Sequence, residues 1–359
     1  MTKEKQYSKA LKRLFAFLAT LLGIYAAVII VFDPFFLYHK PVFGDRTPMT
    51  DSLNQVPGSI RNFNYDSILV GDSLVENCNT DLLNNKYGNI LKVTKESGAL
   101  CDLLEYEKMA QKEKKLDYVL WGLDFSQLDS TPTVTVNSSA DNGYIYTKSP
   151  LDDIEYLFNK EILFSTIPTM IYNYVNHKNA GPMAYNWADT KEFSVSQAMS
   201  RHVRPDNVTD IADVSDAYDY GKVAENLQLL TQEVNANPET EYIFIIPPVS
   251  MNYWDAAYLN GEINIRLKVW EDVYRTLLEI DNVRIFCYQN DRDIICNLNN
   301  YMDLVHGSQS VCDYVMSSLF AEMSEVTLDN VNDIIVDTSA MVDFIENEAI
   351  YRYYDKNIQ

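Results

Sequence analysis

An uncharged run near the N-terminus constrains this chain more than any other feature. Residues 14–32 contain no Asp, Glu, Lys or Arg and are rich in Leu, Ala, Ile and Val. As a helix, a run of this length crosses a hydrocarbon core of about 30 Å. A cleaved signal peptide is the alternative, but the run exceeds the usual h-region, and no small-x-small cleavage site follows it. The sequence therefore predicts an uncleaved transmembrane helix.

The charges that flank this run predict its orientation. Basic residues precede it at Lys3, Lys5, Lys9, Lys12 and Arg13. Basic flanks of a membrane span stay in the cytoplasm. We therefore expect a cytoplasmic N-terminus over residues 1–13, a single pass through the cell membrane over residues 14–32, and an extracellular main domain.

Composition excludes several classes of partner. The net charge is −22, from 29 basic and 51 acidic residues, so a broad nucleic-acid surface is not expected. Five cysteines without CxxC spacing indicate neither a zinc site nor a disulfide framework, which leaves buried free thiols or one bridge between Cys287 and Cys296. No metal-ligand cluster or nucleotide-binding glycine motif stands out, so we expect no metal and no cofactor.

Short apolar runs alternate with segments of helical spacing. The runs, typical of buried strands, lie at residues 67–71, 90–93, 118–122, 242–246 and 283–286. Helical spacing occupies residues 100–112, 223–236, 265–280 and 308–323. This alternation predicts a three-layer α/β/α fold with a mostly parallel central sheet. We expect a juxtamembrane linker at 33–64, the domain at 65–323 with an insertion at about 127–217, and an acidic C-terminal tail at 324–359.

Ser73 is the candidate nucleophile. It follows the first apolar run in Gly71-Asp72-Ser73, where a strand-to-helix turn would expose Oγ and direct backbone N–H groups toward a developing oxyanion. Taken alone, the tripeptide is also a common turn and helix cap.

Asp303 and His306 lie far along the chain, just before the last predicted helix of the domain. At this spacing the imidazole can face a serine on a neighbouring loop while the carboxylate fixes its tautomer. Of the four histidines, His306 is the one in a loop that a sheet could return to Ser73. An exposed residue at a helix start is the alternative for His306.

Together these residues resemble the four ordered blocks of the SGNH (GDSL) hydrolases. Gly71-Asp72-Ser73, Ser97-Gly98 and Gly122-Leu-Asp124 follow the first three predicted strands, and Asp303-x-x-His306 precedes the last predicted helix, all between residues 67 and 323. The resemblance implies a flavodoxin-like SGNH domain. It also implies that Ser73 is the nucleophile, His306 the base and Asp303 the orienting acid, with the N–H groups of Ser73 and Gly98 in the oxyanion hole.

The third block departs from this family pattern. The family usually has Gly-x-Asn-Asp, whose Asn donates to the oxyanion, whereas this chain has Asp124 at that position. An ionised carboxylate cannot donate a hydrogen bond and would repel the oxyanion. Asp124 therefore points elsewhere, holds another group, or is protonated.

Within the class, the anchored arrangement looks like exported proteins of Gram-positive bacteria that work beside membrane-bound O-acyltransferases. These include the teichoic-acid D-alanyl transfer and polysaccharide O-acetylation proteins. The Pro-Pro turn in residues 245–250 resembles that subgroup. The resemblance implies a serine esterase or O-acyltransferase acting on a cell-surface polysaccharide or teichoic acid. Two alternatives stay open: a carbohydrate deacetylase, and a non-catalytic partner subunit that binds polymer or docks with a membrane-bound O-acyltransferase.

Aromatic residues supply candidates for substrate binding. Tyr253 and Trp254 follow the Pro-Pro turn and could stack against sugar rings. Packing within the core is the alternative for both.

Overall fold

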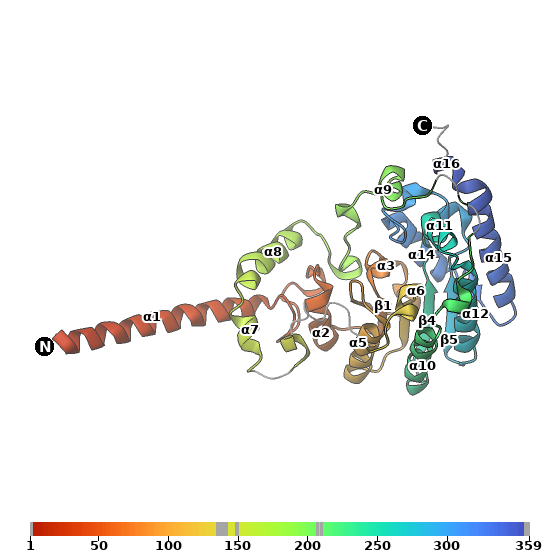
Figure 1. Cartoon of the computed structure of the whole chain (residues 1–359). Helices are drawn as coiled ribbons and strands as arrows, with labels where there is room; N and C mark the ends of the chain where they lie inside the picture. The colour runs from red at the N-terminus through yellow and green to blue at the C-terminus, as the bar shows by residue number, and fades with distance from the viewer. Residues whose placement is uncertain (1–2, 134–142, 148–150, 206–207, 209–210, 355–359) are drawn as a thin grey trace. The chain divides into compact units, whose positions relative to one another are not determined.

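The structure is a computed structural model that describes residues 3–133, 143–147, 151–205, 208 and 211–354. The chain forms two compact units (Figure 1). Unit 1 comprises Met1–Phe63 and Ser139–Gly181, and unit 2 comprises Asn64–Ser138 and Pro182–Gln359.

Unit 2 is built on a mostly parallel β-sheet. Within the described residues its strand order is β2-β1-β3-β4-β5-β6, and only β6 pairs antiparallel. The strands are β1 (Ser67–Gly71), β2 (Ile90–Thr94), β3 (Tyr118–Gly122), β4 (Glu241–Ile246), β5 (Val283–Cys287) and β6 (Glu325–Val326). The five predicted strands are confirmed, because strands covered on both faces are continuously apolar.

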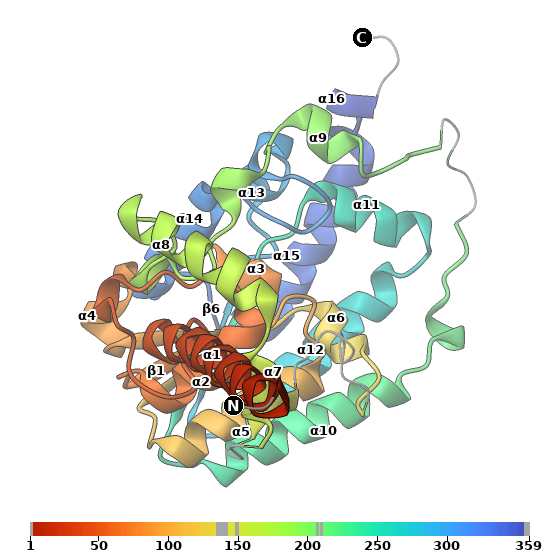
Figure 2. The same ribbon diagram turned by 90° about the vertical axis from the view of Figure 1, so that its left-hand side faces the viewer.

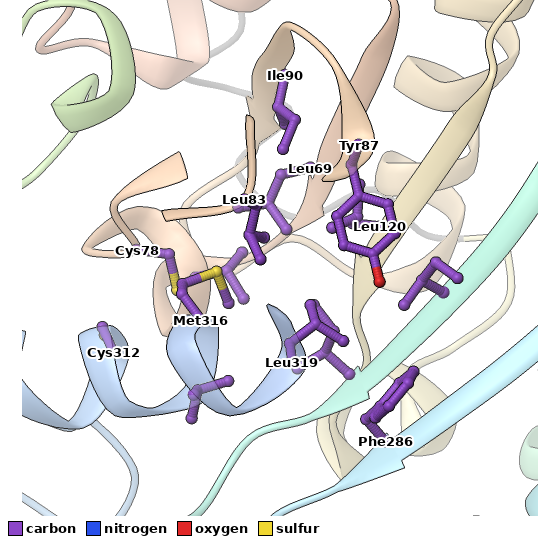
Figure 3. Close-up of a cluster of buried hydrophobic side chains, with 14 of the residues drawn as sticks. Leu69, Cys78, Leu83, Tyr87, Ile90, Leu120, Phe286, Cys312, Met316 and Leu319 are labelled. Carbon is purple, nitrogen blue, oxygen red and sulfur yellow. The ribbon is translucent and has the colours of Figure 1, made fainter. Parts of the chain in front are cut away.

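Helices cover both faces of this sheet, as expected. On one face, α14 (Gln309–Phe320) and the short α3 (Ser73–Glu76) and α4 (Asn84–Tyr87) pack on a cluster that includes Leu69, Leu120 and Phe286 (Figure 3). The other face carries α5 (Leu100–Glu113), α10 (Gly221–Ala236) and α12 (Ile263–Leu278). The four long helices agree with the predicted helical segments.

The C-terminal segment folds onto unit 2, although its acidity suggested a tail. Besides β6, it contains α15 (Val331–Phe344), the π-helical turn η9 (Ile345–Ala349) and α16 (Tyr351–Tyr354), and α15 packs against α12. Met341 and Ile345 are fully buried in a cluster with Trp254. The acidic residues alternate with an apolar stripe, and that stripe adds a helix to the core. Residues 355–359 lie outside the described chain.

Unit 1 begins with α1 (Lys3–Phe32), which is long and apolar enough to cross a membrane. Residues 33–64, expected to be a linker, contain α2 (Ser52–Asn62), most of which is buried. The chain passes so close to α2 that a Cβ on Gly58 would lie 2.0 Å from the Phe35 carbonyl oxygen. Glycine permits this approach, so the segment is a packed part of unit 1.

The expected insertion at 127–217 contributes to both units. Its part in unit 1 includes α7 (Asp153–Leu157), the π-helical turn η4 (Ile162–Thr166) and α8 (Ile167–Val175), and its part in unit 2 includes α9 (Val195–Met199). Residues 134–142, 148–150, 206–207 and 209–210 of this insertion lie outside the described chain.

Cys78, Cys287, Cys296 and Cys312 are buried free thiols, and Cys101 is partly buried. Cys287 ends β5 and Cys296 follows α13 (Arg292–Ile295), and the two are not bridged.

Glu107 on α5 is a buried carboxyl group that should make stability depend on pH. Burial and then the neighbouring Glu233 raise the pKa of Glu107 to about 8. The neutral form is therefore favoured in the folded state, and this contribution, complete below about pH 4.5, is lost as the pH rises through about 8. Glu107→Gln keeps an acceptor for the Tyr242 hydroxyl, which donates to Glu107 at 2.8 Å.

We expect Glu107→Gln to be about 4 kcal/mol more stable than the wild type at pH 8 and nearly equal to it at pH 4.5. Urea unfolding of the full chain at both pH values measures the difference. Equal stability at pH 8 would show that Glu107 ionises without cost.

Candidate active site

Ser73 lies at the turn between β1 and α3, at the carboxyl edge of the sheet. Asp72 caps α3 by accepting the N–H of Leu74 at 2.9 Å. A Cβ on Gly71 or Gly122 would lie within 2.5 Å of the Val75 side chain. The two glycines thus let Val75 pack over the ends of neighbouring strands, which holds the turn tight and leaves the half-buried Ser73 at the edge where ligands bind in parallel sheets.

The loop before α14 carries the candidate base. An antiparallel bridge between Tyr301 and Gly307 closes this loop. Inside it, Asp303 Oδ1 accepts the backbone N–H groups of Val305 at 2.9 Å and His306 at 2.8 Å. The loop is therefore folded around one carboxylate oxygen.

The other oxygen of that carboxylate begins a chain of hydrogen bonds to Ser73. His306 Nδ1 lies 2.8 Å from Asp303 Oδ2, and His306 Nε2 lies 2.9 Å from Ser73 Oγ. In this network Nδ1–H donates to the carboxylate and Nε2 accepts from the serine hydroxyl. The structure thus brings together the three residues expected to form the catalytic group, from segments more than 200 residues apart.

Asp303, the acid at the end of this hydrogen-bond chain, stays ionised. Burial raises the pKa of Asp303, but the hydrogen bonds that it accepts from His306 and from the Val305 N–H outweigh burial and lower it below its ordinary value. The side chains of Asp303 and His306 are 21% and 22% exposed, so they remain reachable from solvent. An ionised Asp303 stabilises the imidazolium that forms when His306 takes a proton.

Asp124 holds another group rather than standing free. It caps α6 (Phe125–Asp129) by accepting the Gln127 N–H at 2.9 Å, and it also accepts the Ser126 hydroxyl. Its carboxyl group is hydrogen-bonded to Asp72 as well. Burial and then the charge of Asp124 raise the pKa of Asp72 well above its ordinary value, and burial raises the pKa of Asp124 as well, so the pair favours a shared proton, which we place on Asp72.

Gly98 does not offer its N–H as the resemblance implies. That N–H donates to the carbonyl oxygen of Lys95 at 2.9 Å, within a turn in which Ser97 has a φ of +56°. The left-handed backbone at Ser97 closes the turn on itself, so the Gly98 N–H is engaged there. Ser73 remains as the oxyanion donor of the expected set, because the first N–H groups of a helix have no partner within it.

Trp187, which the sequence did not suggest, lies against the candidate base. Its ring meets the His306 ring edge-on, with centroids 5.4 Å apart. The Trp187 indole N–H donates to Glu76 at 3.1 Å, and its backbone N–H donates to Asn77 at 3.0 Å. Glu76 and Asn77 follow Ser73 by three and four residues, so the serine segment also positions this aromatic wall.

Of the two aromatics expected to bind substrate, one is excluded. Trp254 is fully buried in the core of unit 2, where it has no face for a ligand. Tyr253 is half-buried and hydrogen-bonded to Arg266, whose guanidinium lies 4.6 Å from the Tyr253 ring centroid. Burial raises the pKa of Tyr253 to about 12, with the charge of Arg266 opposing the shift and the charge of Asp124 adding to it.

A small apolar pocket adjoins the residues on either side of Ser73 and His306. Leu74 and Val75 line it from the serine side, and Val305 and Gly307 from the histidine side. Its volume of about 20 Å³ is near the 10–15 Å³ that one water molecule needs. The remaining lining residues are Cys78, Ile245, Pro247, Pro248, Val311, Cys312 and Val315. The Pro-Pro turn after β4 is thus part of its wall.

Comparison with known proteins assigns no family. A scan against protein-family models, a search of curated proteins and a search of solved structures each return no match for this chain. Within the described residues, no group of three His, Cys, Asp or Glu side chains is placed to hold a metal ion. The chemistry of the site therefore has to be argued from its geometry.

The proton on Asp72 should set an alkaline limit on activity. Losing it would put a second negative charge one residue from Ser73, where an oxyanion has to form. Asp72→Asn preserves the cap and donates a hydrogen bond to Asp124 without a titratable proton. We expect wild-type turnover of an acetyl ester to fall about tenfold at alkaline pH, and Asp72→Asn to retain its rate there.

The measurement is the pH dependence of kcat for both proteins. Asp81→Asn removes an exposed carboxylate from the same segment and should keep the wild-type profile. If the kcat of the wild type and that of Asp72→Asn fell equally at alkaline pH, Asp72 would not have this role.

Proposed function

We propose that this protein is a membrane-anchored serine esterase or O-acyltransferase of the SGNH class, acting outside the cell on an envelope glycopolymer. The observation that carries the proposal is the hydrogen-bond chain Asp303–His306–Ser73. Because unrelated folds use this arrangement for acyl transfer, the proposal rests on the geometry of the site and not on the fold.

In the first half-reaction, Ser73 Oγ attacks the acyl carbonyl carbon while His306 Nε2 takes the hydroxyl proton. The intermediate collapses, His306 returns the proton to the departing alkoxide, and an acyl ester remains on Ser73. In the second half-reaction, a polymer hydroxyl or water gives its proton to His306 and attacks the ester. The bond from the acyl carbon to Ser73 Oγ breaks, and His306 returns the proton to Oγ, which restores Ser73. Transfer and hydrolysis differ only in whether a polymer hydroxyl or a water molecule attacks the acyl ester.

The pocket beside the catalytic group supports a short acyl chain. A volume of about 20 Å³ accommodates a group the size of a methyl, and no charged side chain lines the pocket. An acetyl group meets both conditions, whereas a D-alanyl group would bring an ammonium into an apolar pocket. Among the acyl groups that the resemblance suggests, the pocket favours acetyl.

Trp187 supports a carbohydrate acceptor. It stands beside His306, and its ring also stacks with Phe193, at a centroid distance of 6.4 Å. Aromatic faces next to a nucleophile bind sugar rings by stacking. The anchor α1, its basic N-terminal flank and the acidic main domain agree with an extracellular site near the membrane, where a membrane-bound O-acyltransferase could supply the acyl group.

A specific observation favours the second candidate, a non-catalytic partner subunit. Gly98 and Asp124, two of the three expected oxyanion positions, are engaged elsewhere. The loss of one oxyanion donor costs about 10²–10³ in rate. A chain using this fold only to bind polymer or dock with an acyltransferase would not need those donors.

Hydrolysis of p-nitrophenyl acetate, butyrate and octanoate by the full chain in detergent separates the two candidates. We expect turnover of acetate with a kcat/KM at least about tenfold above that for octanoate. Val311→Ala, which widens the pocket, should raise the butyrate-to-acetate ratio, whereas Val273→Ala, an equal truncation on α12, should not. No turnover of any ester by the folded chain would favour the partner subunit.

A further inference from the structure

The last turns of α1 pack against the other helices of unit 1. The Tyr25 ring stacks on the Phe158 ring, with centroids 6.0 Å apart. Ile29 is fully buried in a cluster with Ile162 and Ile167. Figures 1 and 2 show α7 beside the C-terminal end of α1. Residues 158–167 are therefore held against the part of α1 that belongs to the apolar span.

This packing sets the depth in the membrane of the helices that contact α1. Tyr25 lies seven residues before Phe32, the end of α1, which is about 10 Å along a helix that rises 1.5 Å per residue. When α1 crosses the membrane, whatever contacts Tyr25 and Ile29 lies at the level of the outer leaflet. The turn that contains Phe158 and Ile162 is thus carried into the boundary between headgroups and acyl chains.

The adjoining segment, residues 162–175, has the uncharged composition that a position at the membrane boundary requires. Residues 162–175 contain no charged side chain. Ile162, Ile167 and Met170 face inward and are buried. On the outside, Phe164 is 74% and Val175 65% exposed, and Ile171 and Tyr172 between them are also exposed. A soluble surface rarely leaves such a stripe to water.

Polar groups border this stripe where lipid headgroups would lie. Lys160 and Glu161 are exposed just before it, and Lys160 can extend its ammonium toward the headgroups. Beyond its other end, the Arg46 guanidinium lies 4.9 Å from the Tyr174 ring centroid and is hydrogen-bonded to His177 at 3.1 Å. An apolar stripe with aromatic and basic borders is the pattern of an interfacial membrane helix.

We propose that residues 162–175, over η4 and α8, form a second membrane contact that lies in the outer interface of the bilayer. Its occupant is lipid, because the stripe continues the apolar surface of α1 and carries no charge of its own. The inference rests on α1 crossing the membrane and is independent of the chemistry at Ser73. Such a contact would fix unit 1 at the membrane surface by two elements instead of one.

The test places an environment-sensitive NBD label on the full chain in vesicles of phosphatidylcholine and phosphatidylglycerol. Cys101→Ser removes the one cysteine that is not buried. Labels are attached in separate Phe164→Cys and Val175→Cys variants. Leu18→Cys, in the middle of α1, and Glu279→Cys, exposed on unit 2, are the membrane and water controls.

We expect lipid with a shallow doxyl quencher to reduce the emission at positions 164 and 175, and lipid with a deep quencher to reduce the emission at position 18. The label at position 279 should keep its emission. Unquenched labels at 164 and 175 in vesicles where position 18 is quenched would overturn the proposal, and shielding of these positions only in native membranes would assign the stripe to a protein. An unquenched label at position 18 would remove the premise and overturn it too.

Discussion

Replacing His306 by alanine should abolish acyl transfer by this protein. In serine hydrolases, loss of the base costs about 10⁶ in kcat, because the serine hydroxyl keeps its proton. Here Nε2 of His306 is the group 2.9 Å from Ser73 Oγ, and Nδ1 of the same ring lies 2.8 Å from Asp303 Oδ2. We expect p-nitrophenyl acetate turnover by His306→Ala to fall by at least about 10⁴-fold.

A matched control removes a different imidazole, one that lies outside the candidate active site. His177 is exposed on unit 1, and His177→Ala should turn over the ester at the wild-type rate. Far-ultraviolet circular dichroism of both variants establishes that they fold. A His306→Ala variant that retains more than a tenth of wild-type turnover would show that His306 is not the base.

Asp303→Asn should reduce kcat by about 10⁴-fold while leaving the fold intact. The reason lies in the two backbone N–H groups, of Val305 and His306, that donate to Asp303 Oδ1. An asparagine keeps its oxygen toward these donors, so its NH₂ group faces His306 Nδ1. The imidazole must then carry its proton on Nε2, and that nitrogen can no longer accept from Ser73.

The measurement is single-turnover acylation at pH 7, with thermal unfolding as the check on stability. Asp329→Asn, an exposed carboxylate, is the control for charge and should acylate as the wild type does. Asp303→Asn acylation within tenfold of the wild type would show that the tautomer is not set by this carboxylate.

The parts of the fold that follow from local pattern could be predicted from sequence. The five parallel strands are mostly apolar runs, because both faces of such a sheet are covered, and Lys92 in β2 and Arg284 in β5 are the basic exceptions. The Asp303–His306 spacing also predicts a contact, since three residues of one loop suffice to form it. Their meeting with Ser73 was expected because the carboxyl ends of parallel strands share one edge.

Other features depend on contacts that no local pattern reveals. The proton shared by Asp72 and Asp124 arises because β1 and β3 are adjacent, which brings two acids, 52 positions apart, to one edge. Trp187 comes from an irregular segment with no periodicity. The engagement of the Gly98 N–H follows from the left-handed backbone of Ser97, which the sequence does not signal.

Burial explains two further differences between the sequence predictions and the structure, at Trp254 and in the C-terminal segment. Trp254 follows a Pro-Pro turn, a place typical of exposed aromatics, yet the C-terminal segment folds over it. That segment is acidic, and its apolar stripe is evident only once Met341 and Ile345 are seen to share one face. Whether a segment is covered depends on which distant part of the chain packs on it, and composition does not show this.

Labelling with a fluorophosphonate probe shows whether Ser73 is an activated nucleophile. The full chain in detergent is treated with the probe, digested and analysed by mass spectrometry, in parallel with Ser73→Ala and His306→Ala. We expect a phosphonyl adduct on the peptide that contains Ser73 in the wild type, and none in either variant. If the folded wild-type chain took no label, or if Ser73→Ala took it equally, Ser73 would not be the nucleophile.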